Sequence, residues 1–197
     1  MIKNIILTAL LLTTGMLCKA QKTKAVQPKK IFFTSYVGLA KTDAGTQIAK
    51  SNGFQAMTGI EYKIKGNSAI YGEINFDSYK YSKQTPFYSI NGNISTIPIT
   101  VGYKQYFLKS KIKPYFKLGV GLANITKPEV TYIGGFTSIN NQSKIVTQYQ
   151  TNAGINYSFK LDYRIFVEVG YQQFSNNNLL NQTYSNKALR VGLSTAL

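Results

Sequence analysis

Seven charged residues stand within segments that are otherwise apolar or small and polar. They are Glu61, Glu73, Asp77, Lys104, Lys117, Glu168 and Arg190. In an extended chain, side chains two positions apart point the same way, and all seven then share the face opposite the apolar one. Acids and bases confined to one face can form structural ion pairs. The alternative chemistry is a proton relay, a gated pore or a small-ligand site.

The residue types present argue against an enzyme. The sequence contains no His and only one Cys, which removes Ser-His-Asp triads, Cys-His dyads and His-ligated metal sites. Paired carboxylates remain available only among the seven charges above. We therefore predict no catalytic, cofactor-binding or metal-binding residue, and no cofactor. The interpretation that we carry forward is a structural network of paired charges.

Eight segments with an apolar residue at every second position carry these charges. Their apolar faces fall within 33–39, 54–64, 70–76, 97–103, 116–122, 149–159, 165–171 and 189–197. Each is about the length of a tilted strand that crosses a bilayer. The opposite faces are rich in Gly, Asn, Gln and Thr.

The connections between these segments alternate in length. Those at 65–67, 108–113 and 160–163 are short, whereas 41–52, 80–92, 125–145 and 176–185 are longer and polar. Short turns at one end and long loops at the other are typical of outer-membrane barrels. The sequence therefore predicts an all-β fold, an eight-stranded antiparallel up-and-down transmembrane β-barrel with four long loops.

A soluble exported β-barrel or sandwich is the competing interpretation. Such a lipocalin-like protein would bind a small apolar ligand and would alternate in the same way. The two interpretations differ in where the apolar side chains point. A membrane barrel turns Ile99, Val120 and Val169 toward lipid, whereas a soluble barrel turns them inward.

The N-terminal residues have the features of a secretory signal peptide. Lys3 precedes a short apolar run, and Cys18-Lys19-Ala20 offers small residues for cleavage before Gln21. Lipidation at Cys18 and a buried N-terminal helix are alternatives. Cleavage would lower the net charge from +16 to +14 by removing Lys3 and Lys19. We predict a signal peptide at 1–20, a flexible periplasmic lead-in at 21–30 and a barrel domain at 31–197.

Three short motifs resemble those of a known family. They are Ile-Pro-Ile-Thr-Val-Gly-Tyr at 97–103, Lys-Pro-Tyr-Phe-Lys-Leu-Gly-Val-Gly at 113–121, and Leu-Arg-Val-Gly-Leu at 189–193. In order and spacing, 31–197 is similar to the small eight-stranded outer-membrane β-barrels of OmpA/OmpX-like shape. The resemblance implies a bacterial outer-membrane protein with both termini in the periplasm. It also implies a structural, adhesion or surface-interaction role carried by the loops.

The distribution of Tyr and Lys suggests which partners the chain meets. Tyrosines are expected to form the interface belts, and the candidates are Tyr62, Tyr103, Tyr106, Tyr115, Tyr157, Tyr163 and Tyr171. Basic residues near the short turns favour anionic head groups; they are Lys63, Lys65, Lys109, Lys111, Lys113, Lys160 and Arg164. Outer-membrane lipids, lipopolysaccharide and the outer-membrane assembly machinery are the expected partners. An extracellular partner would bind the loops at 41–52, 80–92, 125–145 and 176–185. A nucleic-acid partner is not expected, because the signal peptide predicts export.

Overall fold

The computed structural model describes residues 30–42, 52–64, 66–84, 89–133, 136–160, 162–177 and 182–197. The expected signal peptide at 1–20 and most of the lead-in at 21–30 lie outside these residues, so both stay predictions. Within the described ranges, no helix is long and apolar enough to cross a membrane.

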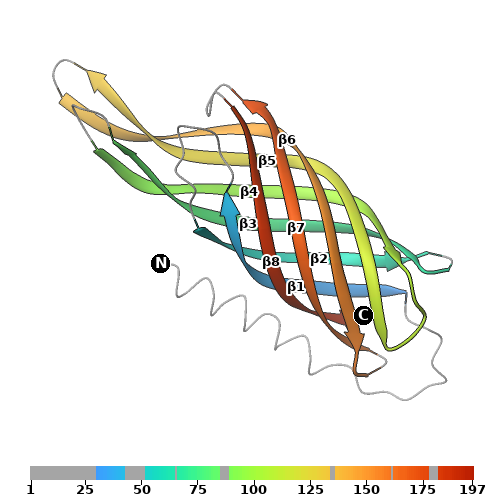
Figure 1. The fold of residues 1–197 in the computed structure, drawn as a ribbon. Helices are drawn as coiled ribbons and strands as arrows, with labels where there is room; N and C mark the ends of the chain where they lie inside the picture. The colour runs from blue at the N-terminus through green and yellow to red at the C-terminus, as the bar shows by residue number, and fades with distance from the viewer. Residues whose placement is uncertain are drawn as a thin grey trace.

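Eight antiparallel strands close into a barrel in which each strand pairs with the next and β8 returns to β1 (Figure 1). They are β1 (Ile31–Thr42), β2 (Asn52–Lys63), β3 (Ser68–Gln84), β4 (Ser89–Tyr106), β5 (Ile112–Ile133), β6 (Phe136–Ser158), β7 (Tyr163–Asn177) and β8 (Gln182–Ala196). The predicted fold class is confirmed. Closure gives every strand of the wall two neighbours, which leaves no open edge there.

The start of β1 and the end of β8 lie at the end of the barrel that carries the short turns. Phe32 lies opposite Ala196 in the register, and the backbone N–H of Leu197 donates to the carbonyl of Ile31 at 3.0 Å. The β2–β3 turn at this end is tight because Gly66 adopts a positive φ of 85°, which Gly tolerates without strain.

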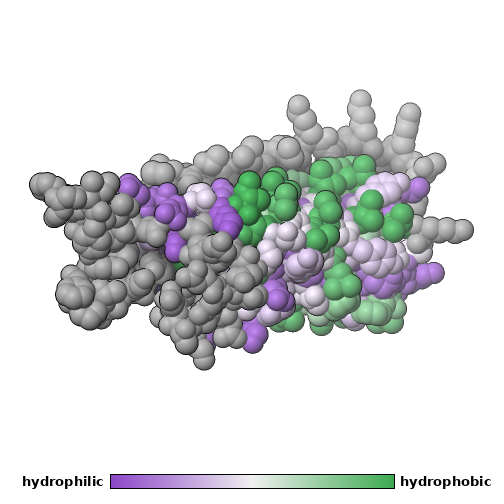
Figure 2. Space-filling view, turned by 90° about the horizontal axis from the view of Figure 1, so that it is seen from above, coloured by the Kyte–Doolittle hydropathy of each residue, from purple (hydrophilic) through white to green (hydrophobic). Residues whose placement is uncertain are grey.

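The apolar faces point outward on all eight strands. Val101, Leu122 and Val169 are 62%, 58% and 56% exposed, whereas Glu73, Lys117 and Glu168 on the alternate positions are buried. In Figure 2 the hydrophobic residues gather around the middle of the molecule, with hydrophilic residues on both sides. The predicted faces are confirmed, and the lipocalin-like arrangement, which requires the apolar set inside, is wrong.

Two of the seven tyrosines assigned to the interface belts face the lumen instead. Tyr106 and Tyr115 are only 4% and 2% exposed, whereas Tyr62, Tyr103 and Tyr157 are at least 40% exposed. The reason is strand parity, because Tyr106 and Tyr115 lie two positions from the inward-facing Lys104 and Lys117. The belt assignment follows residue type, whereas the alternation of side chains along each strand places these two tyrosines inside.

Two of the four long loops are mostly strand. β3 and β4 continue to Gln84 and Ser89, and β5 and β6 continue to Ile133 and Phe136. β5 and β6 contain 22 and 23 residues, about twice the 9–11 that cross a bilayer. Their outer halves lack the alternation of apolar and polar residues that water and lipid impose on a membrane wall. Their polar composition is instead typical of loops, which is why loops were expected there. Residues 43–51 and 178–181 of the other two predicted loops lie outside the described residues.

Glycines on the inner face make room for large side chains from neighbouring strands. A Cβ on Gly102 or Gly119 would collide with Tyr71, one on Gly154 with Tyr115, and one on Gly192 with Phe166. Such pairing of small with large residues fills the narrow interior of a small barrel. This is why the inner faces of the strands are unusually rich in Gly.

Replacing Gly102 by Ala should destabilise the barrel by about 1–3 kcal/mol. The added Cβ would overlap the Leu118 carbonyl and would lie 2.5 Å from Tyr71 Cζ. Gly72→Ala is the matched control, since nothing lies within 4 Å of its Cβ position, and it should change stability by less than about 1 kcal/mol. Urea unfolding of both variants in vesicles checks the prediction, and equal losses would contradict it.

The lumen holds two apolar clusters, one toward the long hairpins and one, which includes Met57 and Phe166, toward the short turns. A cluster that includes Tyr79, Ile94, Ile125, Phe174 and Tyr184 fills the upper part. The tyrosine and phenylalanine rings interlock there, with Phe174 and Tyr184 centroids 5.0 Å apart. Charged and amide side chains occupy the lumen below this cluster, where the candidate site lies.

Candidate functional site

Glu61 on β2 is the centre of one group of charges, called here the Glu61 cluster. Lys104 Nζ on β4 lies 2.9 Å from Glu61 Oε2, and Arg164 Nη1 on β7 lies 3.2 Å from Oε1. The Tyr106 hydroxyl donates to the same carboxylate at 2.8 Å. All four side chains are almost completely buried. One carboxylate thus compensates two cations inside the barrel.

A second group lies deeper along the lumen and is called here the Glu168 cluster. Lys117 Nζ lies 2.9 Å from Glu73 and 3.4 Å from Glu168, and Arg190 Nη1 lies 3.0 Å from Glu168. Two acids and two bases from β3, β5, β7 and β8 therefore alternate in one chain of contacts. The charges of this group balance.

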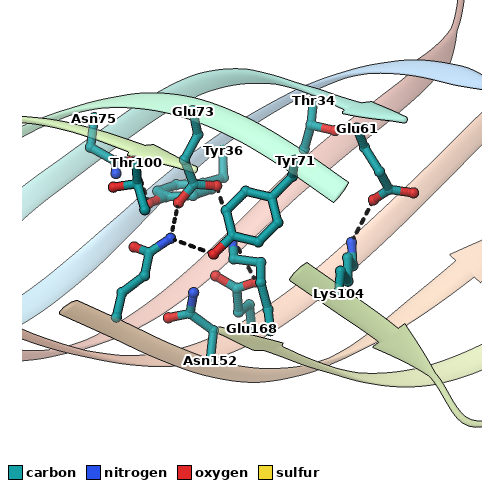
Figure 3. A network of polar contacts seen from close by, with 12 residues as sticks. Thr34, Tyr36, Glu61, Tyr71, Glu73, Asn75, Thr100, Lys104, Asn152 and Glu168 are labelled. Atoms are coloured by element: carbon teal, nitrogen blue, oxygen red, sulfur yellow. Dashed lines mark hydrogen bonds and ion pairs between the residues drawn. The ribbon is translucent and has the colours of Figure 1, made fainter. Parts of the chain in front are cut away.

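Neutral side chains supply the hydrogen bonds that these buried ions still need. Gln150 donates to the Tyr71 hydroxyl at 3.0 Å and to Glu73. Figure 3 shows the Tyr71 and Glu73 side chains within this network. Tyr115 donates to Glu168 at 3.0 Å, and Arg190 Nε donates to Gln55 at 2.9 Å. Buried ion pairs offset their desolvation only with such additional bonds. The network is therefore built like a structural element of the lumen.

Asp77 stands apart from both clusters. Its side chain is fully buried and accepts a hydrogen bond from Thr96 at 3.0 Å. It forms no ion pair with any residue that the structure describes. Its Oδ1 atom also has no hydrogen-bond partner there, although Arg190 is an electrostatic neighbour.

All seven charges named from the sequence therefore lie in the lumen, six of them in the two clusters. Sequence reasoning missed Arg164, which it assigned to the basic short-turn surface. Arg164 is 3% exposed and contacts Glu61. The sequence does indicate this inward position, because Arg164, Phe166 and Glu168 are two positions apart on β7 and their side chains therefore point the same way. The tyrosines and glutamines that complete the network also occupy inward positions.

Little space remains between the two clusters. A cavity of about 20 Å³ is lined by Glu61, Lys104, Glu73, Lys117 and other residues. This volume holds about one water molecule. The charged interior can therefore hold trapped water, but this gap has no room for a small-molecule ligand.

The second candidate site is the part of the chain that rises above the wall. β5 and β6 stay paired up to Ile133 and Phe136. By contrast, the pairing of β5 with β4 stops at Thr126, and that of β6 with β7 stops at Gln148. The hairpin formed by 127–147 thus projects beyond its neighbours, and Figure 1 shows it beside the shorter β3–β4 hairpin. Asn140, Asn141 and Gln142 are exposed on this hairpin.

Comparisons with known proteins find likeness in structure alone. Neisserial surface protein A aligns with 85% of this chain and 97% of its own, with a TM-score of 0.61 at 15% identity. Ail, the attachment invasion locus protein of Yersinia pestis, aligns with 85% of this chain and 99% of its own, with a TM-score of 0.50 at 14% identity. The outer membrane protein AlkL aligns with 91% of this chain and 96% of its own, with a TM-score of 0.51 at 13% identity.

No family model matches the sequence, and no curated protein matches it. At these identities, the structural likeness shows a shared fold.

Proposed function

We propose that this chain, whose fold is that of the eight-stranded outer-membrane β-barrels, is an integral outer-membrane protein with a structural, adhesion or surface-interaction role. Its long hairpins would carry that role, and its lumen would be closed by paired charges. The observation that carries the proposal is the combination of an apolar outer wall with an ionised interior. In water this arrangement would expose a large apolar surface; in a bilayer it buries that surface.

The hairpins support the surface role. The β5–β6 hairpin rises well beyond the strand length that a bilayer needs. Polar chain held out from a rigid scaffold is where binding residues concentrate. Two proteins of similar fold are described as a surface protein and an attachment invasion locus protein. The role that we propose is non-catalytic, in keeping with a sequence that contains no His.

The partners that we propose follow from the proposed location in the outer membrane. Lipids would cover the apolar wall, and lysines on the upper strands, such as Lys80 and Lys144, would meet lipopolysaccharide phosphates. Outer-membrane assembly machinery would insert the barrel. Both termini would lie in the periplasm together with the short turns.

Heat-modifiability tests the membrane barrel directly. The protein is expressed with its own N-terminal segment, and isolated outer membranes are run on SDS gels with and without boiling. We expect a membrane-fraction band that migrates faster without boiling, because a closed, fully hydrogen-bonded barrel resists SDS. A soluble periplasmic protein with a single mobility would overturn the proposal.

Cysteine labelling on intact cells tests the orientation. The sole cysteine, Cys18, lies in the segment that we expect to be removed. A membrane-impermeant maleimide should therefore label Asn141→Cys on the β5–β6 hairpin of intact cells. It should label Lys109→Cys on the β4–β5 turn only after the outer membrane is opened. The reverse pattern would place the long hairpins in the periplasm. The parent protein, which carries neither introduced cysteine, is the control for background labelling.

A further inference from the structure

Positive charge collects where the lumen opens at the short-turn end. Arg164 Cζ lies 3.4 Å from the centroid of the Phe32 ring, and Lys63 Nζ lies 4.8 Å from the same centroid. Lys113 on β5 is an electrostatic neighbour of both cations. All three occupy inward positions, because they lie two residues from Tyr115, Glu61 or Phe166. Cations from β2, β5 and β7 thus gather around one opening, called here the short-turn mouth.

The acids that face this mouth are too few to balance it. Glu61 is already shared between Lys104 and Arg164. Asp162 on the β6–β7 turn is the other acidic side chain near this end among the described residues, and it has an interaction of its own. Neither Lys63 nor Lys113 forms an ion pair with an acid in the described ranges. The Glu61 cluster and the mouth together hold four cations around one carboxylate.

Polar atoms without partners border the same opening. Ser158 Oγ is buried and has no hydrogen-bond partner, and Ser158 lies opposite Arg164 in the β6–β7 register. Asn156, which lies opposite Lys113, has an unpartnered Oδ1. Buried polar groups are rarely left unsatisfied in native proteins. A hydroxyl that can donate therefore sits beside an excess of positive charge.

We propose that the short-turn mouth binds a phosphate-type anion. The ammonium groups of Lys63 and Lys113 and the hydroxyl of Ser158 would donate to its oxygens, and Arg164 would add an attractive field from inside the lumen. Charge-assisted hydrogen bonds of this kind are strong. Three donor side chains on three strands could each bond a different oxygen, which suits a tetrahedral oxyanion better than a planar carboxylate. The group can belong to a lipid head or to a soluble phosphate. The site does not depend on what the long hairpins bind.

Calorimetric titration with inorganic phosphate tests this site in protein purified from membranes in a non-ionic detergent. Lys63→Met/Lys113→Met should weaken binding at least about tenfold, since each charge-assisted bond lost is worth about that factor. The matched control Lys109→Met/Lys160→Met removes the same charge from the exposed turns and should change binding less than about twofold. Lys63→Arg/Lys113→Arg should retain binding.

The unboiled gel mobility of every variant verifies that it is folded before titration. Equal weakening in the two Met double variants would show diffuse attraction and overturn the proposal. So would the absence of phosphate binding to the unaltered protein. Repeating the titration in nanodiscs of zwitterionic lipid, with and without phosphatidylglycerol, identifies the source. Loss of phosphate binding with phosphatidylglycerol assigns the mouth to a lipid head group, and unchanged binding assigns it to a soluble phosphate.

Discussion

Replacing Glu61 by Gln should lower the free energy of unfolding by about 3–5 kcal/mol, the cost of breaking a buried ion pair by removing one partner. Among the described residues, Glu61 is the one carboxylate that forms ion pairs with Lys104 and Arg164, at 2.9 and 3.2 Å. Its loss leaves two buried cations without a counter-charge, beside a mouth that is already positive. Urea titration of the folded fraction in lipid vesicles, followed by circular dichroism, measures the effect.

A second substitution separates charge from packing at the same place. Lys104→Met removes one of the two cations, so Glu61→Gln/Lys104→Met should recover part of the stability lost in Glu61→Gln alone. Such coupling is expected between residues in direct contact. If Glu61→Gln costs less than about 1 kcal/mol, the network contributes little, and the proposal that it closes the lumen as a structural element is wrong.

Val120→Arg and Val169→Arg should each destabilise the barrel by about 2–4 kcal/mol in a bilayer. Both side chains are exposed on the wall, at 48% and 56%, among other apolar residues. An Arg there must either desolvate its charge in hydrocarbon or distort the surrounding lipid. The urea titration described for Glu61 reports the difference.

Asn141→Arg is the matched control for the lipid-facing variants. Asn141 is exposed on the β5–β6 hairpin, beyond the last pairing of β6 with β7 at Gln148. Water surrounds that position if the apolar wall lies in a membrane, so the change should cost less than about 0.5 kcal/mol. Equal stability of Val120→Arg, Val169→Arg and Asn141→Arg would show that the wall does not contact lipid.

The direction of each side chain could be predicted from the sequence wherever the prediction used the alternation of apolar and polar residues. Ile99, Val120 and Val169 were expected outside, and Lys117 and Glu168 inside, and the structure places them so. Alternation is a local property of an extended chain, and a wall with lipid on one side would impose it residue by residue. The errors arose where residue type replaced that rule: Tyr106, Tyr115 and Arg164 were assigned by chemical character although their parity pointed inward.

The lengths of the hairpins and the partners of each charge were decided only by the tertiary structure. Above the wall, β5 and β6 need only each other's backbone hydrogen bonds, so no apolar pattern marks their continuation to Ile133 and Phe136. Glu61 meets Lys104 across the lumen from strands that are not neighbours. Which inward residues meet depends on strand stagger and closure, which are set by all eight strands together. The sequence by itself therefore determined an alternating wall with charges inside, and closure of the barrel decided which of those charges pair.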